Sequence, residues 1–142
     1  MQQSKQAYSH LGYRLPIGVT HRPDATTYQQ YLTTFERVCD EWDVKNDSRA
    51  TLLDVSSRTF YRWRHKSELA TLSNDQRKRI SLLANIYVDL HIVFDENAAL
   101  ANAWVRRPNT AFSARAPLDL LLARSLLEFQ AVFLYLRQVA RR

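Results

Sequence analysis

The sequence predicts an all-α protein, and three observations favour this fold class. Only two glycines and four prolines occur among 142 residues, so the turns that join strands are few. Leu, Ala, Arg and Gln, which are good helix formers, are frequent. Apolar residues recur at steps of three and four, the period of an amphipathic helix. With 46% apolar and 24% charged residues, the chain suits one compact domain or two small helical subdomains that share a core.

The N-terminal segment differs from the rest of the chain. Residues 1–24 hold both glycines and two of the prolines and show no period, which predicts an N-terminal arm. Helical periodicity begins at Ala25 and continues to Trp42, and one face of this first helix is apolar. The residues of that face are Tyr28, Tyr31, Leu32, Phe35, Val38, Cys39 and Trp42.

Two short helices are predicted next. The polar run KNDS offers Asn46 and Asp47 as caps for a helix that ends at Leu53. Ser56 or Ser57 can cap the helix that follows it. The short segment between the two helices predicts a tight turn.

The two short helices have the spacing of a helix-turn-helix unit. Ala50 supplies a small residue where the helices cross, and Asp54 occupies the turn, because Asp adopts the left-handed conformation more readily than most residues. The apolar residues that can lock the helices together are Leu53, Val55, Phe60 and Trp63. Residues 57–65 then form the recognition helix. The alternative is a trihelical packing module in which this helix only covers the core.

Positive charge is concentrated around this unit. The net charge is +6, and residues 45–79 hold nine Lys or Arg against four acids, whereas residues 25–44 hold one against four. A localised basic segment predicts contact with DNA, and Ser57, Arg58 and Arg62 are placed to reach base edges. The side chains expected at phosphates are Arg64, His65, Lys66, Arg77, Lys78 and Arg79. The candidate DNA-binding set is Ser57, Arg58, Thr59, Tyr61, Arg62, Arg64 and Lys66.

A longer helix follows residues 73–75, and a shorter one is predicted over 96–107. The longer helix carries one apolar stripe, in which His91 is expected to be a core histidine. The members of this stripe are Ile80, Leu83, Ala84, Tyr87, His91 and Phe94.

Two prolines predict an elbow before the last helical segment. Pro108 cannot continue a helix because it lacks an amide donor, and Asn109 can shape the turn after it. Pro117 suits the first turn of the next helix, with Ala116 extended before it. The side chains that can anchor the elbow to the core are Trp104 and Phe112.

The last helix, or helix pair, runs from residue 117 to residue 142. Its apolar residues between 118 and 140 exceed a single face, whereas a surface helix of a monomer usually has one apolar stripe. This excess predicts a dimer seam or a partner surface. The alternative is that this segment is the central core helix of a small bundle.

The sequence lacks the signatures of an enzyme. We find no phosphate-binding glycine loop, no paired carboxylates in a plausible cleft and no Cys or Ser nucleophile with an evident His partner. Cys39 is the one cysteine and the four histidines lack metal-ligand spacing, so no metal or cofactor is expected. No apolar run reaches the roughly 20 residues of a membrane span, and we expect a cytoplasmic protein.

Residues 104–121 follow the pattern WVxxPNxxFxxxAPLDLL, preceded by IVFDENAALANAW and, earlier, by TFYRWR. Together these segments resemble the Xre/MbcA/ParS antitoxin family. The resemblance implies a helix-turn-helix DNA-binding domain over residues 25–94 and a toxin-binding domain over residues 95–142, after the arm of residues 1–24. It also implies a type II antitoxin that blocks the active-site cleft of a RES-domain, NAD-consuming toxin. Such an antitoxin represses its own operon, usually as a homodimer.

The resemblance also assigns roles to individual residues. The motif positions are Trp104, Pro108, Phe112, Pro117 and Leu118. The residues implied in toxin contact are Arg106, Arg107, Asn109, Arg115, Arg141 and Arg142. A second interpretation remains, in which the protein is a stand-alone helix-turn-helix regulator that uses its C-terminal helices only to dimerise.

Overall fold

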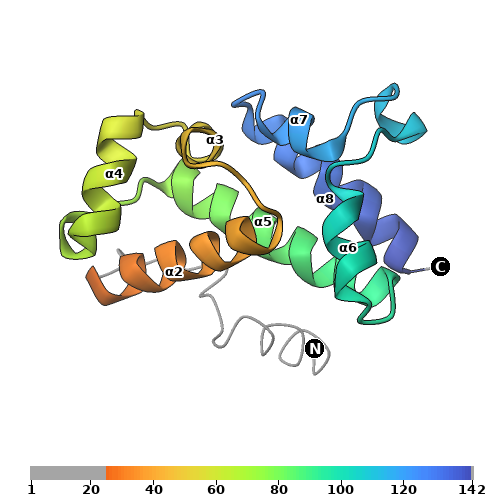
Figure 1. The fold of residues 1–142 in the computed structure, drawn as a ribbon, viewed down its shortest axis with the longest axis horizontal. Helices are drawn as coiled ribbons and strands as arrows, with labels where there is room; N and C mark the ends of the chain where they lie inside the picture. Colours follow the sequence, from red (N-terminus) through yellow and green to blue (C-terminus); the bar gives the residue numbers. More distant parts are fainter. Residues whose placement is uncertain (1–24, 142) are drawn as a thin grey trace.

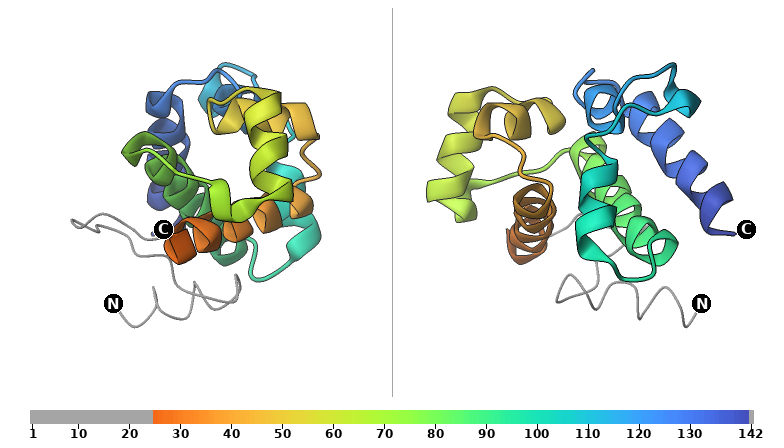
Figure 2. Two further views of the ribbon diagram at one scale, coloured as in Figure 1. Left: turned by 90° about the vertical axis from the view of Figure 1, so that its left-hand side faces the viewer. Right: turned by 45° about the vertical axis from the view of Figure 1, so that its right-hand side comes forward.

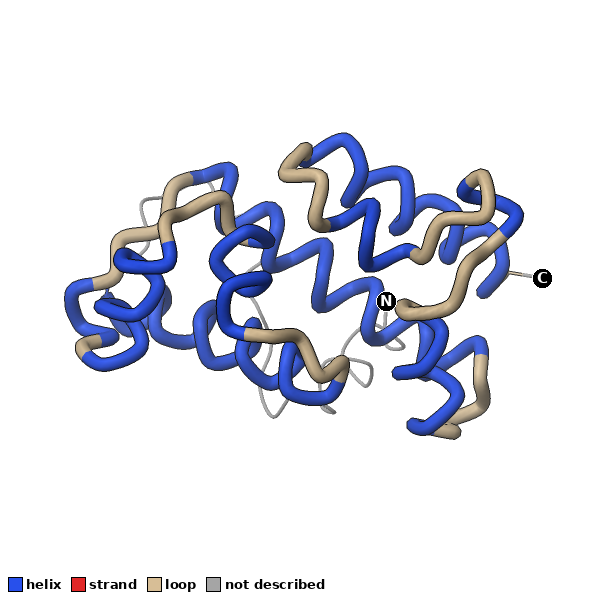
Figure 3. The backbone as a smooth tube through the Cα atoms, turned by 45° about the horizontal axis from the view of Figure 1, so that its top comes forward, coloured by secondary structure: helices blue, strands red, loops and turns tan. Residues whose placement is uncertain are grey.

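The structure is a computed structural model and describes residues 25–141, so the predicted N-terminal arm lies outside the described residues. Within this range the all-α prediction is confirmed, with seven α-helices, two short 3-10 helices and no strand (Figure 3). The α-helices are α2 (Ala25–Glu41), α3 (Asn46–Leu52), α4 (Ser57–His65), α5 (Asn74–Val93), α6 (Ala98–Trp104), α7 (Pro117–Leu121) and α8 (Leu126–Ala140). The 3-10 helices are η1 (Ser67–Leu69) and η2 (Thr110–Phe112).

The helices gather in two groups that share α5 (Figure 1). α2, α3 and α4 lie at one end, α6, α7 and α8 lie at the other, and α5 runs through both. The right-hand view in Figure 2 shows the same division. A single apolar core extends from Tyr28 in α2 to Leu136 in α8. The two groups therefore share one core built around α5.

α2 buries the face that its periodicity predicts. Phe35, Val38 and Cys39 have no exposed surface, and Trp42 is buried just after the helix ends. Burial raises the pKa of the Cys39 thiol, which is thereby kept protonated as a core residue.

The caps predicted for α3 are wrong. This helix begins at Asn46 itself, after Lys45 in an extended conformation, and it has no side-chain cap. The side chain of Asn46 accepts a hydrogen bond from Arg64 Nη1 at 2.7 Å, and that of Asp47 accepts one from the Ser57 hydroxyl at 3.3 Å. Both polar side chains thus join α3 to α4.

Serine caps begin the next two α-helices. Ser56 Oγ accepts from the Thr59 amide at 3.1 Å, and Ser73 forms a reciprocal capping box with Gln76 at the start of α5. α5 is buried around most of its circumference because α2, α6 and α8 all pack against it. His91 is buried on this helix, as its position on the apolar stripe predicts.

α6 begins later and ends earlier than predicted. Two left-handed residues, Asp95 and Glu96, turn the chain before it, and the helix stops at Trp104. The carbonyl oxygen of Val105 accepts a hydrogen bond from the Leu118 amide at 2.8 Å, at the start of α7. The helix therefore ends four residues before Pro108, where the carbonyl oxygen of Val105 binds the start of α7 and not a further turn of α6.

The last segment is a pair of helices. Pro117 occupies the first turn of α7, after an extended Ala116, as predicted. Leu121 and Phe129 are fully buried, so part of this segment is core. On the outer face of α8, however, Leu127 and Leu134 remain 67% and 59% exposed. Part of the apolar excess is therefore core and part is exposed on the outer face of α8, where a dimer seam or partner surface stays a prediction.

Candidate DNA and partner surfaces

The turn between α3 and α4 has helix-turn-helix geometry. Asp54 lies in the left-handed region with φ of 54°, as its place in the turn predicts. Ala50 is buried, and its carbonyl oxygen accepts a hydrogen bond from the Val55 amide at 3.0 Å. On α4, Phe60 and Trp63 face the core. The sequence prediction for this unit is therefore confirmed in its geometry.

Three of the seven candidate DNA-binding side chains are held by contacts inside the helix-turn-helix unit. Ser57 donates to Asp47, and the Thr59 hydroxyl accepts from Ser56 Oγ at 3.0 Å. Arg64 donates to Glu36 at 2.7 Å and to Asn46, with its guanidinium carbon 5.4 Å from the centre of the Phe60 ring. These contacts orient α4 against α2 and α3.

Acidic residues of α2 compensate the inward-facing arginines. Glu36 binds Arg64 and also Arg49, whose guanidinium is buried and lies 2.9 Å from Asp40 as well. The acidic segment and the basic segment of the sequence thus neutralise each other on this side of the unit. The remaining positive charge of α4 lies on the opposite, outer face.

The outer face of α4 carries cations whose charge no residue of the described part of the chain compensates. Among the described residues, the side chains of Arg58, Arg62 and Lys66 have no ion pair and no hydrogen bond. They line a shallow surface hollow together with Thr59, Tyr61, His65 and Leu69. Cations four residues apart on a helix repel each other, so their arrangement favours an external polyanion. This basic hollow is the candidate DNA surface.

Tyr61 is the largest exposed apolar side chain of this hollow. Its ring lies 4.0 Å from the His65 ring, centre to centre, and is 64% exposed. An exposed aromatic ring that packs on a neighbouring histidine can contact a base edge or a thymine methyl group. Tyr61 therefore belongs with the residues that can reach bases.

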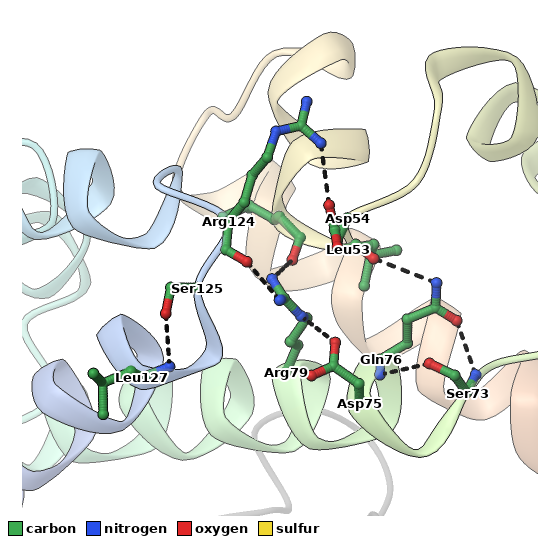
Figure 4. A network of polar contacts seen from close by, with 10 residues as sticks. Leu53, Asp54, Ser73, Asp75, Gln76, Arg79, Arg124, Ser125 and Leu127 are labelled. Atoms are coloured by element: carbon green, nitrogen blue, oxygen red, sulfur yellow. Dashed lines mark hydrogen bonds and ion pairs between the residues drawn. The ribbon is translucent and has the colours of Figure 1, made fainter.

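The expected phosphate contact of Arg79 is wrong (Figure 4). Its side chain is only 4% exposed and donates to Asp75 Oδ2 at 2.6 Å and to the carbonyl oxygens of Leu52 and Arg124 at 3.3 and 2.6 Å. Its guanidinium carbon also lies 5.3 Å from the centre of the Phe129 ring. Asp75, one helical turn earlier, was the signal in the sequence that Arg79 has an internal partner. Of its neighbours, Arg77 donates to the Leu72 carbonyl oxygen and Lys78 is exposed.

An aromatic cluster anchors the elbow to α8, as expected for Trp104 and Phe112. Trp104 stacks on Tyr135 with ring centres 6.2 Å apart, and Phe112 meets both rings edge to face. Tyr135 is the member that the motif did not reveal. The cluster fixes the loop that follows α6 against the last helix.

Asn109 shapes the elbow loop through its own backbone and side chain. Its Oδ1 accepts from the Ala111 amide at 2.9 Å, and its amide donates to the Arg115 carbonyl oxygen at 3.1 Å. Ser113 and Ala114 both have positive φ, 55° and 64°, at the tip of the loop. The geometry gives Asn109 a role in forming the loop, whether or not it also meets a partner.

The arginines implied in toxin contact divide into two kinds. Arg106 is bound by backbone, since its guanidinium donates to the carbonyl oxygens of Trp42, at 2.6 and 2.9 Å, and of Asp43. Arg106 thus holds the elbow to the end of α2, although the residue is also exposed, and its toxin contact stays a prediction. Arg107, Arg115 and Arg141 are exposed. The sixth candidate, Arg142, lies outside the described residues.

An ion pair between the buried Asp89 and the partly exposed Arg137 joins α5 to α8 and has no counterpart in the sequence motifs. Arg137 Nε lies 3.1 Å from Asp89 Oδ2, and its guanidinium lies over the Phe133 ring. Burial raises the pKa of Asp89, while Arg137 and Arg141 act in the opposite direction. Together with the Arg79 contact to Phe129, this pair sets the register of the two helices.

The described residues contain no group of three or more His, Cys, Asp or Glu side chains arranged to hold a metal ion. In the same part of the chain, no helix combines the length and the apolar character needed to cross a membrane.

Comparisons with known proteins match both groups of helices. Residues 32–85 are similar to the antitoxin Xre-like helix-turn-helix domain, and residues 89–139 to the antitoxin Xre/MbcA/ParS C-terminal toxin-binding domain. The uncharacterized protein y4oB of Sinorhizobium fredii (strain NBRC 101917 / NGR234) is 31% identical over 120 residues, which cover 84% of this chain and 91% of that protein. No solved structure matches.

Proposed function

Since the chain belongs to the Xre/MbcA/ParS antitoxin family, with a helix-turn-helix domain and a toxin-binding domain, we propose that it neutralises a RES-domain, NAD-consuming toxin and represses its own operon. It would act by binding, without chemistry of its own. The C-terminal domain would cover the active-site cleft of the toxin, and the helix-turn-helix domain would bind operator DNA. We propose the domain limits 25–94 and 95–142, with α5 at the centre of the core that both domains share.

The basic hollow on α4 is the observation that supports operator binding. Arg58 lies in the first turn of α4 and Arg62 one turn later, and neither side chain has a partner among the described residues, so both are available to read bases. Lys66 at the end of the helix would contact a phosphate. Ser57, Thr59 and Arg64 would act mainly by orienting α4, because their side chains are already bound within the unit.

The exposed arginines around the elbow support a toxin surface at the other end of the molecule. The side chains of Arg107 and Arg115 make no ion pair or hydrogen bond with any described residue, and they flank the loop that the aromatic cluster holds rigid. Arg141 follows the end of α8. We propose that these three arginines meet an acidic surface of the toxin, while Arg106 and Asn109 hold the loop in shape.

Co-expression with the protein encoded by the neighbouring gene tests the antitoxin proposal. The neighbour should arrest growth when produced alone, and this chain should restore growth and co-purify with it. A neighbour that is harmless alone, or that does not co-purify, would instead favour the stand-alone regulator. In that case the C-terminal helices would serve only to dimerise.

Reversing the charge of Arg107 and Arg115 should weaken toxin binding. We expect Arg107→Glu with Arg115→Glu to lower the affinity about tenfold or more, because acidic groups would then face an acidic surface. The thermal midpoint should change little, since both side chains are exposed. Binding is measured by calorimetry with a catalytically inactive toxin. The matched control, Arg58→Glu with Arg62→Glu, reverses two charges on α4 and should keep full toxin affinity. If both variants bind the toxin with equal affinity, Arg107 and Arg115 are not part of the toxin surface.

The outer face of α8 is the surface that we propose for a homodimer seam. Leu127, Ala131 and Leu134 form an exposed apolar stripe on it. A two-fold dimer would present two recognition helices, which suits a palindromic operator whose half-sites lie about 34 Å apart.

Leu134→Glu should therefore convert a dimer to a monomer. The substitution places a charge in the seam but leaves the monomer stable, since Leu134 is mostly exposed in it. Light scattering coupled to gel filtration measures the mass. Thr33→Glu, at an exposed position of α2, serves as the control with an added charge outside the seam and should stay dimeric. A wild-type protein that is monomeric at tens of micromolar would contradict the seam.

A further inference from the structure

Polar contacts that join the two domains meet at Arg124, in the loop between α7 and α8 (Figure 4). Its carbonyl oxygen accepts from Arg79 Nη2 at 2.6 Å, and its own guanidinium lies 3.2 Å from Asp54 Oδ1. Arg124 lies in the region that matches the toxin-binding domain, whereas Arg79 and Asp54 lie in the region that matches the helix-turn-helix domain. The contacts therefore cross the domain boundary.

Three long side chains hold the turn before the recognition helix. Each of them binds a different one of three consecutive residues in the turn. These contacts are Arg79 Nη1 to the Leu52 carbonyl oxygen (3.3 Å), Gln76 Nε2 to the Leu53 carbonyl oxygen (3.4 Å) and Arg124 Nη1 to Asp54 Oδ1 (3.2 Å). Two of the three come from α5 and one comes from the toxin-binding domain. α4 begins three residues after Asp54, so the direction of its axis depends on this turn.

The Arg124 contact is fixed at the backbone and exposed at the side chain. Arg124 and Asp54 both have left-handed backbone conformations, with φ of 69° and 54°. The Arg124 carbonyl is held by the buried Arg79, whereas the Arg124 side chain is 57% exposed. The side chain can therefore be replaced without opening the core, which separates its effect on α4 from its effect on folding.

We propose that Arg124 is a positioning residue for operator binding, which orients α4 through Asp54 without touching DNA. The proposal rests on the operator binding proposed above. α8 begins two residues after Arg124, and its far end lies beside Arg141 in the proposed toxin surface. A toxin that displaces α8 would thus alter operator affinity through this contact. By linkage, operator DNA would alter toxin affinity by the same factor.

The test compares Arg124→Ala, Arg124→Lys, Asp54→Asn and the Arg124→Ala, Asp54→Asn double variant in binding to the DNA upstream of the gene. Asn keeps the turn because it also adopts the left-handed conformation. We expect Arg124→Ala and Asp54→Asn each to weaken binding by up to about fivefold, the range of one exposed ion pair. The double variant should be no weaker than either single variant, since both remove the same contact. Arg124→Lys should retain part of the affinity, and thermal midpoints should stay close to that of the wild type.

Salt dependence and the sign of the Asp54→Asn effect distinguish positioning from direct contact. If Arg124 itself binds a phosphate, Arg124→Ala lowers the slope of log K against log salt by about 0.9, and Asp54→Asn, which removes a negative charge, strengthens binding. Either result overturns the proposal, as does unchanged affinity in both single variants. An unchanged slope with weaker binding in both supports it. A wild-type chain that binds no upstream DNA contradicts the proposed function instead.

Discussion

Arg58→Ala combined with Arg62→Ala should weaken operator binding by about 30-fold or more and leave toxin neutralisation intact. Each arginine that reads a base contributes about 1 to 3 kcal/mol, so the pair accounts for at least about 2 kcal/mol. If one of them contacts a phosphate instead, the slope of log K against log salt falls by about 0.9. Titration of a labelled operator at several salt concentrations measures both quantities.

The double variant should be at least as stable as the wild type. Neither side chain has a partner among the described residues, and the two like charges one turn apart repel each other by a few tenths of a kcal/mol. Alanine also has the highest helix propensity, so α4 is not weakened. A thermal midpoint equal to or slightly above that of the wild type is therefore expected. This makes loss of DNA binding attributable to the missing contacts.

Arg107→Ala with Arg115→Ala is the matched control for charge. This variant also removes two positive charges, but at the end of the molecule that lies away from α4. Salt screens the effect of these charges on DNA, so operator affinity should stay within about twofold. If this control loses operator binding as strongly as the α4 variant, the interaction is a general attraction of a basic protein. If the α4 variant loses toxin neutralisation as well, misfolding explains both losses.

The helix-turn-helix unit was the most predictable part of the fold, because its determinants are local. Asp54 in the left-handed turn, Ser56 as a cap and the inward pair Phe60 and Trp63 all follow from spacing within about fifteen residues. The bounds of α4 agree with the predicted recognition helix for the same reason. Signals of this kind do not depend on what packs on the unit from outside.

The roles of the arginines were the least predictable, because distant partners decide them. Arg58 and Arg64 look alike in the sequence, yet among the described residues the first has no partner and the second binds Glu36 of α2. For Arg79 the sequence offers Asp75 as a partner, but it does not show that the side chain is buried against Phe129 of α8. Arg106 likewise binds the carbonyl oxygen of Trp42, 64 residues away in the sequence. The tertiary structure is needed to distinguish arginines that stabilise the fold through internal contacts from arginines that are available to bind a ligand.

Arg79→Met should destabilise the protein by about 3 kcal/mol. The substitution preserves much of the side-chain volume, so most of the lost stability comes from hydrogen bonds. The carbonyl oxygens of Leu52 and Arg124 lose their donor, which costs about 1 to 3 kcal/mol for each oxygen. Loss of the contact with the Phe129 ring adds to this. Asp75 contributes little because it is 48% exposed and can be solvated when unpaired. The thermal midpoint should fall by roughly 10 °C.

The neighbouring residue supplies the control for this prediction. Lys78→Met removes a cation from the same turn of α5, but at an exposed position, and should change stability by less than about 0.5 kcal/mol. Because Arg79 joins the turn before α4 to the loop before α8, its loss should also lower operator and toxin affinity together, in contrast to the selective loss in the α4 variant. Equal thermal midpoints for Arg79→Met and Lys78→Met would mean that the buried contacts of Arg79 do not hold the two domains together. If the Arg79→Met protein is fully stable and loses operator binding alone, Arg79 contacts DNA, as predicted from the sequence.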